Sequence, residues 1–184
     1  MPLRVSRRAA ASLSVLLLAA SILIGWRLQS TRTSLRGGDS SAGARAVLPT
    51  EGQPLPAFDF SDVNGRRVSS EELRGKVLVV DIWASWCEPC KTEMPAFEQL
   101  HQQYRDQGLA IIGISIDITA EDAARFAREI GVTYPIIHNP EIMTEWGLLG
   151  LPTTIVVDRA GVVRKKVIGF EYKEVFEKTL RELL

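Results

Sequence analysis

The chain has 184 residues, which is enough for one domain of ordinary size and an additional segment. Its 22 basic and 22 acidic side chains give a formal net charge of zero, with a sequence pI of about 6.8. This balance excludes the strongly basic surface that favours nucleic acid, and no acidic tail is present.

The N-terminal segment predicts a membrane anchor. Residues 1–8 carry three arginines and are followed by an uncharged run of about 18 residues, 9–26. This run is close to the minimum length that crosses a bilayer, and it is longer than the apolar core of a usual signal peptide. Because no small-x-small cleavage site follows promptly, we expect an uncleaved signal anchor, with cleavage as the alternative.

The arginine counts on the two sides of this run are equal, so they do not set its orientation. The very short leading segment favours a cytoplasmic N-terminus. Residues 27–52 are rich in Ser, Thr, Gly, Arg and Ala and predict a flexible linker. The expected organisation is a cytoplasmic segment (1–8), a transmembrane helix (9–26), the linker (27–52) and a folded domain (53–184) on the extracytoplasmic, periplasmic side of the cytoplasmic membrane.

The folded domain begins with signals for a β-hairpin and a central strand. Residues 55–60 and 66–68 predict short strands, and Asn64-Gly65 between them accepts positive φ at both turn positions. One helical turn is expected from Ser69. Residues 77–83 are apolar except for Asp81, which is typical of a strand covered on both faces.

The remaining chain alternates between helix and strand signals. We expect a helix over 89–107 kinked at Pro95, a buried strand over 109–116, a helix over 119–131 capped by Thr119, a short helix over 139–147, strands over 153–157 and 162–168, and a last amphipathic helix over 172–184. Strands first separated by helices and then paired as a hairpin predict an α/β fold with a mixed sheet and helices on both faces.

Both cysteines of the chain, Cys87 and Cys90, lie between the predicted central strand and the helix that follows it. At a helix N-terminus, unpaired backbone N–H groups and the helix dipole stabilise a thiolate, which lowers the pKa of Cys87 and makes it a nucleophile. Cys90, one turn deeper, can then attack a mixed disulfide formed at Cys87. The C-x-x-C spacing therefore predicts disulfide exchange with another protein.

Three other interpretations of the cysteine pair remain open. Zinc binding needs four ligands, and only His101 and His138 remain as nitrogen donors, at unusual spacings. A purely structural disulfide is possible, but so short a loop restrains the unfolded chain little. Coincidence is the third. We expect no metal and no cofactor other than the redox-active disulfide, and we expect both histidines to be structural or solvated.

The residues Asp81-Ile-Trp-Ala-Ser-Trp-Cys-Glu-Pro-Cys90, Pro95 and Leu151-Pro152-Thr-Thr154 resemble the thioredoxin superfamily. More narrowly, Trp-Cys-Glu-Pro-Cys-Lys-Thr-Glu-Met-Pro95 and Gly150-Leu-Pro-Thr-Thr154, with an N-terminal anchor, resemble the TlpA/ResA-like membrane-anchored thiol–disulfide oxidoreductases. The resemblance covers roughly residues 53–184. It implies a thioredoxin-like three-layer fold with a mixed central sheet, an N-terminal hairpin and a central insertion at 121–140, preceded by a single membrane anchor.

Members of this group typically work outside the cytoplasmic membrane, and many reduce the haem-binding cysteines of apocytochrome c. The resemblance therefore implies an enzyme that reduces protein disulfides, with apocytochrome c as the favoured client and a membrane thiol reductase as the electron donor. Reduction of copper-site cysteines in oxidase assembly is an alternative, as is a metal-binding module using Cys87, Cys90 and His101. A thiol peroxidase is disfavoured by the Trp-Cys-x-x-Cys context.

The resemblance and the local chemistry together suggest four catalytic residues. Cys87 is the expected nucleophile and Cys90 the resolving thiol. Burial should raise the pKa of Asp81, which we expect to take the proton of Cys90. Glu93 matches a glutamate that the TlpA/ResA-like group uses near its active site. The presence of both carboxylates leaves open which one handles the proton.

Five further residues are expected to meet the substrate: Trp86, Glu88, Pro89, Leu151 and Pro152. A cis Pro152 would expose the backbone of Leu151, so that an extended partner segment can pair with it. The charge of Glu88 should oppose the helix dipole and raise the pKa of Cys87, which favours a reductant. The alternative for Glu88 is a solvated loop charge.

Overall fold

The computed structural model describes residues 49–184. The predicted cytoplasmic segment and membrane anchor, and most of the predicted linker, lie outside the described residues. Within the described part, no helix combines the length and the apolar character that crossing a membrane requires.

Two β-sheets are present in residues 49–184. Five strands form the main sheet in the order β5-β4-β3-β6-β7, and a two-stranded hairpin joins β1 to β2. β3, β4 and β5 are parallel, whereas β6 and β7 run antiparallel to their neighbours. The strands are β1 (Asp59–Ser61), β2 (Arg67–Ser69), β3 (Val77–Trp83), β4 (Leu109–Ser115), β5 (Ile136–His138), β6 (Thr153–Val157) and β7 (Val163–Ile168).

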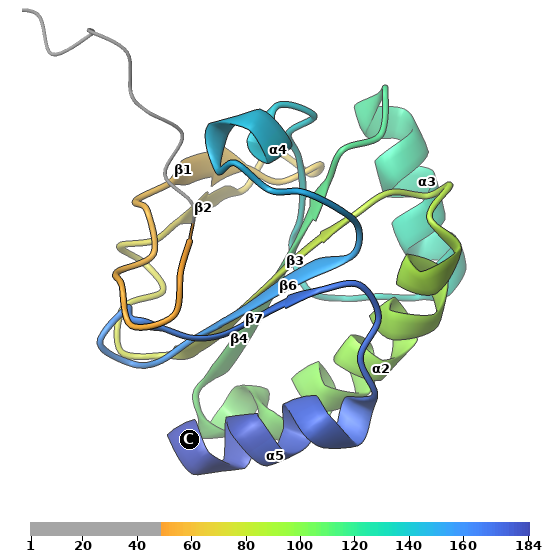
Figure 1. Ribbon diagram of the computed structural model, residues 1–184. Coiled ribbons are helices and arrows are strands. Elements are labelled where there is room, and N and C mark those ends of the chain that lie inside the picture. Colours follow the sequence, from red (N-terminus) through yellow and green to blue (C-terminus); the bar gives the residue numbers. More distant parts are fainter. Residues whose placement is uncertain (1–48) are drawn as a thin grey trace, which may run out of the picture. The chain divides into compact units, whose positions relative to one another are not determined.

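The helices complete three layers around the main sheet, as predicted. They are α2 (Glu88–Tyr104), continued by the 3-10 helix η1 (Arg105–Gln107), then α3 (Ala120–Ile130), α4 (Ile142–Glu145) and α5 (Lys173–Leu183). Helices α2, α3 and α5 cover one face of the sheet, and the β1–β2 hairpin with α4 covers the other (Figure 1). α3 and β5 occupy the stretch where the insertion is expected, and α4 follows it.

The central strands are apolar on both faces because each face lines a separate core. Along β3, Val79 and Trp83 belong to the core shared with α2, α3 and α5, whereas Val80 and Ile82 belong to the core shared with the hairpin and α4. Every residue of β3, β4 and β6 is buried. Continuous apolar runs are therefore required here, and they are what made these strands recognisable in the sequence.

The N-terminal hairpin differs from its prediction in two respects. The first strand begins at Asp59 rather than at residue 55, because the preceding segment bonds elsewhere: the Leu55 N–H donates to the Gly161 carbonyl at 2.9 Å. In the turn, only Gly65 has a positive φ. The Asp62 carboxylate organises this turn instead, accepting the Asn64 N–H at 2.8 Å and the Arg66 N–H at 2.9 Å.

Four other element predictions need correction. The edge strand β5, with three residues, was not predicted, because so short a segment carries no periodicity. The predicted helix over 139–147 contains only the four residues of α4, and the helical turn at Ser69 is a non-helical turn. α2 continues through Pro95 and ends at Tyr104, after which η1 leads to Gly108 with φ of 98°.

We predict that Gly113→Ala destabilises the protein by about 1–3 kcal/mol, because it overpacks the core under β4. Gly113 pairs with Asp81 across β3 and β4, and a Cβ added there would lie 2.8 Å from both the Trp83 Nε1 and the Ile136 Cδ1 atoms. Chemical denaturation measures the effect. The control is Gly150→Ala, whose Cβ would meet only the Ile168 side chain, at 3.2 Å. Equal losses in both variants would contradict the packing argument.

Candidate active site

The two cysteines form a disulfide at the start of α2. β3 ends at Trp83, and Cys87 is the N-cap of α2, with its Sγ accepting the Cys90 N–H at 3.3 Å. The Cα atoms of the pair are 5.3 Å apart. The Cys87 side chain therefore takes the place of an ordinary capping oxygen, and its sulfur lies among the free N–H groups that favour negative charge.

The two sulfurs differ in their exposure to solvent. Cys87 retains 6% of its surface, whereas Cys90 is fully buried. Pro89 lies in the first turn of α2, where its missing N–H leaves no helical hydrogen bond unmade. A partner can consequently reach the pair only at Cys87.

The loop between β3 and Cys87 is held by a residue that the sequence interpretation did not select. The buried carboxylate of Asp117, just beyond β4, accepts the Ser85 N–H at 3.1 Å and the Ser85 and Ser115 hydroxyls at 2.8 Å each. His138 Nε2 donates to the Asp117 carbonyl at 2.8 Å. The available signal was an acidic residue directly after a buried strand. Its partner lies 32 residues away in the sequence, so the contact could not be inferred.

Two carboxyl groups close to the cysteines in the sequence, Asp81 on β3 and Glu93 on α2, are buried. Each is only 1% exposed. Burial raises the pKa of Asp81 well above its ordinary value, and the charge of Glu93 raises it further. Within the described part of the chain, neither Asp81 carboxylate oxygen has a hydrogen-bond partner. The predicted burial of Asp81 is therefore confirmed, and this burial is the main cause that raises its pKa.

Glu93 differs from Asp81 because it has partners. The Glu171 N–H donates to Glu93 Oε1 at 3.3 Å, and the Thr154 hydroxyl donates to Oε2 at 3.4 Å. Burial raises the pKa of Glu93 to about 7, although these two hydrogen bonds lower it in part. Thr154 is also the direct β6 partner of Asp81 on β3, so the two carboxyl groups share one neighbour.

The Leu151–Pro152 peptide bond is cis, as predicted. Leu151 is partly buried against the core cluster that contains both cysteines. The Gly169 N–H donates to the Pro152 carbonyl at 2.8 Å, whereas the Leu151 backbone forms no hydrogen bond within residues 49–184. Its N–H and C=O groups are thus free for a partner strand.

The residues expected to meet the substrate differ in their surroundings. Trp86 is 62% exposed beside Cys87, whereas Trp83 is fully buried in the core, as a packing residue would be. Glu88 is exposed, and its carboxylate lies 2.6 Å from Lys91 Nζ. Because solvent and Lys91 both screen this charge, its effect on Cys87 should be smaller than the sequence suggested.

Most exposed large apolar side chains belong to segments at the cysteine edge of the sheet. These segments follow β3 and β4, precede β6, or include and follow the end of β7, and the side chains are Trp86, Ile118, Leu149, Ile168, Phe170 and Tyr172. Gly150 abuts Ile168, which places the segment before Pro152 against the end of β7. The edge of the sheet at which Cys87 lies therefore exposes apolar side chains, as suits a polypeptide partner.

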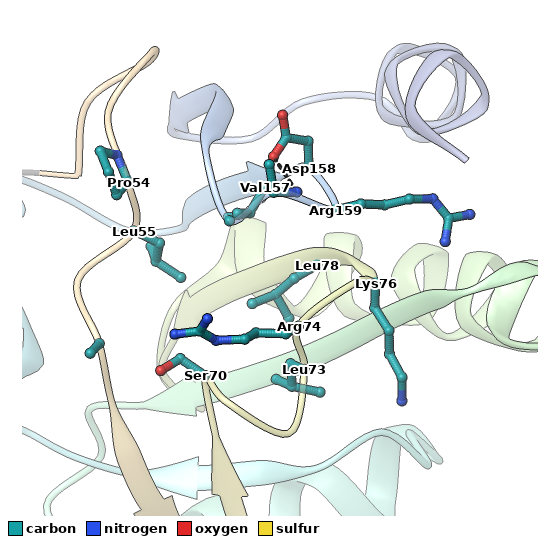
Figure 2. A pocket seen from close by; sticks show the side chains of 13 residues that line it. Pro54, Leu55, Ser70, Leu73, Arg74, Lys76, Leu78, Val157, Asp158 and Arg159 are labelled. Atoms are coloured by element: carbon teal, nitrogen blue, oxygen red, sulfur yellow. Dashed lines mark hydrogen bonds between the residues drawn. The ribbon is translucent and has the colours of Figure 1, made fainter.

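A cavity of about 320 Å³ lies at the opposite edge of the sheet, between the start of β3 and the end of β6. Figure 2 shows Arg74 extending across it between Leu55 and Leu73, while Arg159 points away. Arg159 instead donates to the Gly75, Gln107 and Leu184 carbonyls. The cavity is remote from Cys87 and does not contribute to the cysteine site.

The histidines do not join the cysteines. His101 is half-buried against the Tyr134 ring, 6.0 Å between centroids, and burial lowers its pKa. His138 bonds to the backbone of Asp117. Among residues 49–184, no three His, Cys, Asp or Glu side chains are grouped as metal ligands.

The sequence is similar to a known protein family and to individual thioredoxin-like proteins. The sequence model of the AhpC/TSA family matches residues 51–166. The thiol-disulfide oxidoreductase ResA of Geobacillus thermodenitrificans is 31% identical, over 72% of this chain and 77% of that protein. The thioredoxin-like protein YneN of Bacillus subtilis is 29% identical, over 85% and 88%.

A solved structure agrees with these sequence similarities. The crystal structure of a thiol:disulfide interchange protein of the thioredoxin family from Chlorobium tepidum superposes with a TM-score of 0.65 at 28% identity. The match covers 77% of this chain and 99% of that one. The similarity therefore extends over a whole thioredoxin-like domain.

Proposed function

This chain belongs to the AhpC/TSA family of thioredoxin-like proteins and is a thiol–disulfide oxidoreductase, and from this premise we propose that it reduces disulfides in other proteins through Cys87 and Cys90. The observation that carries the proposal is the pair of sulfurs at the start of α2, with Cys87 reachable and Cys90 buried. Their exchange chemistry needs no further cofactor. The free Leu151 backbone and the apolar surroundings favour an extended polypeptide as the substrate.

The proposed reaction transfers two electrons to the substrate. In the reduced protein, the Cys87 thiolate attacks one sulfur of the substrate disulfide, whose S–S bond breaks as one thiolate leaves. Cys90 then loses its proton and attacks the Cys87 sulfur. The Cys87–Cys90 disulfide forms, the second substrate thiolate leaves, and both substrate thiolates take up protons.

Glu93 is the better candidate for accepting the Cys90 proton, which reverses the expectation from the sequence. Glu93 lies three residues after Cys90 on α2, and its pKa of about 7 means that a large fraction is ionised at neutral pH. Asp81 has a pKa raised well above its ordinary value by burial, and it lacks hydrogen-bond donors within residues 49–184. Asp81 is therefore harder to ionise and is the weaker candidate for the proton acceptor.

The proposed client is apocytochrome c, and the proposed location is the extracytoplasmic side of the cytoplasmic membrane, where the N-terminal segment would anchor the domain. A membrane thiol reductase would return electrons to the pair. These proposals rest on the resemblance of residues 86–95 and 150–154 to the membrane-anchored oxidoreductases. Reduction of copper-site cysteines is the second candidate, because the same chemistry serves both.

Cys90→Ala is expected to trap the client on Cys87 as a mixed disulfide, because the resolving thiol is missing. The variant is expressed in full-length form, captured without reductant, and its partners are identified by mass spectrometry. Cytochrome c polypeptides should be recovered, whereas copper-site proteins would favour the second candidate. Cys87→Ala with Cys90 intact is the control. If both variants retain the same proteins, the proposed roles of the two cysteines are wrong.

A further inference from the structure

Glu171 lies in the short loop between β7 and α5 and contacts Glu93 across 78 residues of sequence. Its backbone N–H is one of the two donors to the buried Glu93 carboxylate, and the Thr154 hydroxyl is the other. The N–H bond, at 3.3 Å, is the shorter of the two. The orientation of Glu93 therefore depends on where this loop lies.

The side chain of Glu171 acts on the same group in the opposite sense. Its carboxylate is 25% exposed and lies 2.5 Å from Lys165 Nζ. The negative charge of Glu171 raises the pKa of Glu93, whereas its N–H lowers it. The Lys165 ammonium offsets part of that negative charge. The charge and the N–H of Glu171 therefore have opposite effects on the pKa of Glu93.

Building on the proposed role of Glu93, we propose that Glu171 is a positioning residue for disulfide exchange: its backbone N–H fixes the Glu93 carboxylate, three residues after Cys90, and its ion pair with Lys165 offsets the negative charge beside that carboxylate. The loop is fixed at both of its ends. The Gly169 N–H donates to the Pro152 carbonyl at 2.8 Å, and Tyr172 is the N-cap residue of α5.

The loop also reaches the surface at the active-site edge. Phe170 and Tyr172, on either side of Glu171, are 42% and 69% exposed, and their ring centroids are 5.3 Å apart. A partner that contacts Phe170 and Tyr172 would shift Glu171, which lies between them and whose N–H donates to Glu93. The fold therefore connects the loop surface with the buried carboxylate through a single residue.

Other groups that face Glu93 come from three further elements. Asp81 on β3 and Thr154 on β6 are described above, and Tyr134, which precedes β5, has a buried hydroxyl whose pKa is raised well above its usual value, mainly by burial and in part by Asp81 and Glu93. These groups remain in place when only Glu171 is changed, so substitutions at that position isolate its contribution.

The test compares Glu171→Ala with Glu171→Pro, because both lack the carboxylate but only proline lacks the N–H. The titration of Glu93 is followed by carboxyl ¹³C NMR in the oxidised protein, and Glu93→Gln assigns the signal. Glu171→Ala should lower the pKa of Glu93 relative to the unsubstituted protein. Glu171→Pro should raise the proton-binding constant about threefold to tenfold above that of Glu171→Ala.

Glu171→Gln, which retains the N–H and a similar shape, covers the case in which proline disrupts the loop. It should lower the pKa of Glu93 with an unchanged melting temperature. Glu174→Ala on the exposed side of α5 is the control and should leave the titration unchanged. A Glu93 titration that is identical in all the Glu171 variants would overturn the proposal.

A second measurement separates this proposal from the proposed function. The pH profile of disulfide exchange should move in parallel with the Glu93 titration in each variant. If the titration moves and the exchange profile does not, the contact between Glu171 and Glu93 stands, but Glu93 is not the proton acceptor and Glu171 has no role in exchange.

Discussion

The oxidised protein should be more stable at pH 5 than at pH 8, with about 2.5 kcal/mol of the difference due to Glu93. Its pKa is raised from 4.5 to about 7 in the folded state, so the folded protein binds the proton more tightly than the unfolded chain. This contribution is fully present below pH 4.5 and is lost as the pH rises through 7. Asp81, whose pKa is also raised, acts in the same direction.

One group opposes this trend in the same pH range. Burial lowers the pKa of His101 below its ordinary value of 6.5, so protonation of the unfolded chain favours unfolding as the pH falls below that value. Carboxyl groups with lowered pKa values, such as Asp62 and Glu98, change the free energy of unfolding only below about pH 4.5. The contribution of Glu93 is therefore measured as the difference in the free energy of unfolding between the unsubstituted protein and a variant changed only at Glu93.

Urea unfolding of the unsubstituted protein and of Glu93→Gln, measured from pH 5 to pH 8, makes this comparison. Glutamine can still accept the Thr154 and Glu171 donors but does not titrate. Its stability should exceed that of the unsubstituted protein at pH 8 and approach it at pH 5. Parallel curves of stability against pH for the two proteins would show that Glu93 has its ordinary pKa, and that its burial does not make stability depend on pH.

Asp117→Ala should cost about 3 kcal/mol of stability and slow disulfide exchange severalfold. The substitution leaves the Ser85 N–H and the Ser85 and Ser115 hydroxyls without their shared acceptor, and a buried donor without a partner costs about 1–3 kcal/mol. Exchange slows because Ser85 belongs to the loop that leads into Cys87. Chemical denaturation and a chromogenic disulfide-exchange assay measure the two effects.

Two further variants test the cause of the Asp117→Ala effects. Asp117→Asn keeps one acceptor oxygen and should lose less stability and less activity than alanine does. Asp122→Ala removes an exposed carboxylate, whose partners are Thr119 and Arg125, and should leave exchange unchanged. If Asp122→Ala slowed exchange as much as Asp117→Ala, the anchoring of the Cys87 loop would not explain the loss.

The catalytic pair could be predicted from the sequence because its signals are local. Cys87 and Cys90 lie between an apolar run and a helical pattern, and this context alone places one sulfur at a helix N-terminus. Asp81 was predicted to be buried because it interrupts a strand that is apolar on both sides. Gly108 and Gly131 lie at the C-terminal ends of the helices predicted over 89–107 and 119–131, and both adopt positive φ.

The surroundings of the pair could not be predicted in the same way. Asp117, Thr154 and Glu171 reach the site from distant elements, and no periodicity connects them to the cysteines. The preference between Asp81 and Glu93 was reversed for the same reason. Only the fold shows that Glu93 receives two hydrogen bonds, whereas Asp81, within residues 49–184, receives none.

By itself, the amino-acid sequence determined the central strands, the helix that carries the cysteines, and the thiol chemistry of the pair. These features depend on residue type and on spacings of a few positions, which set burial and backbone conformation locally. The tertiary structure alone decided what holds the loop before Cys87 and which hydrogen bonds the two buried carboxyl groups receive. Those properties depend on burial and on hydrogen bonds between residues far apart in the sequence, and these exist only once the sheet and its two covering layers have assembled.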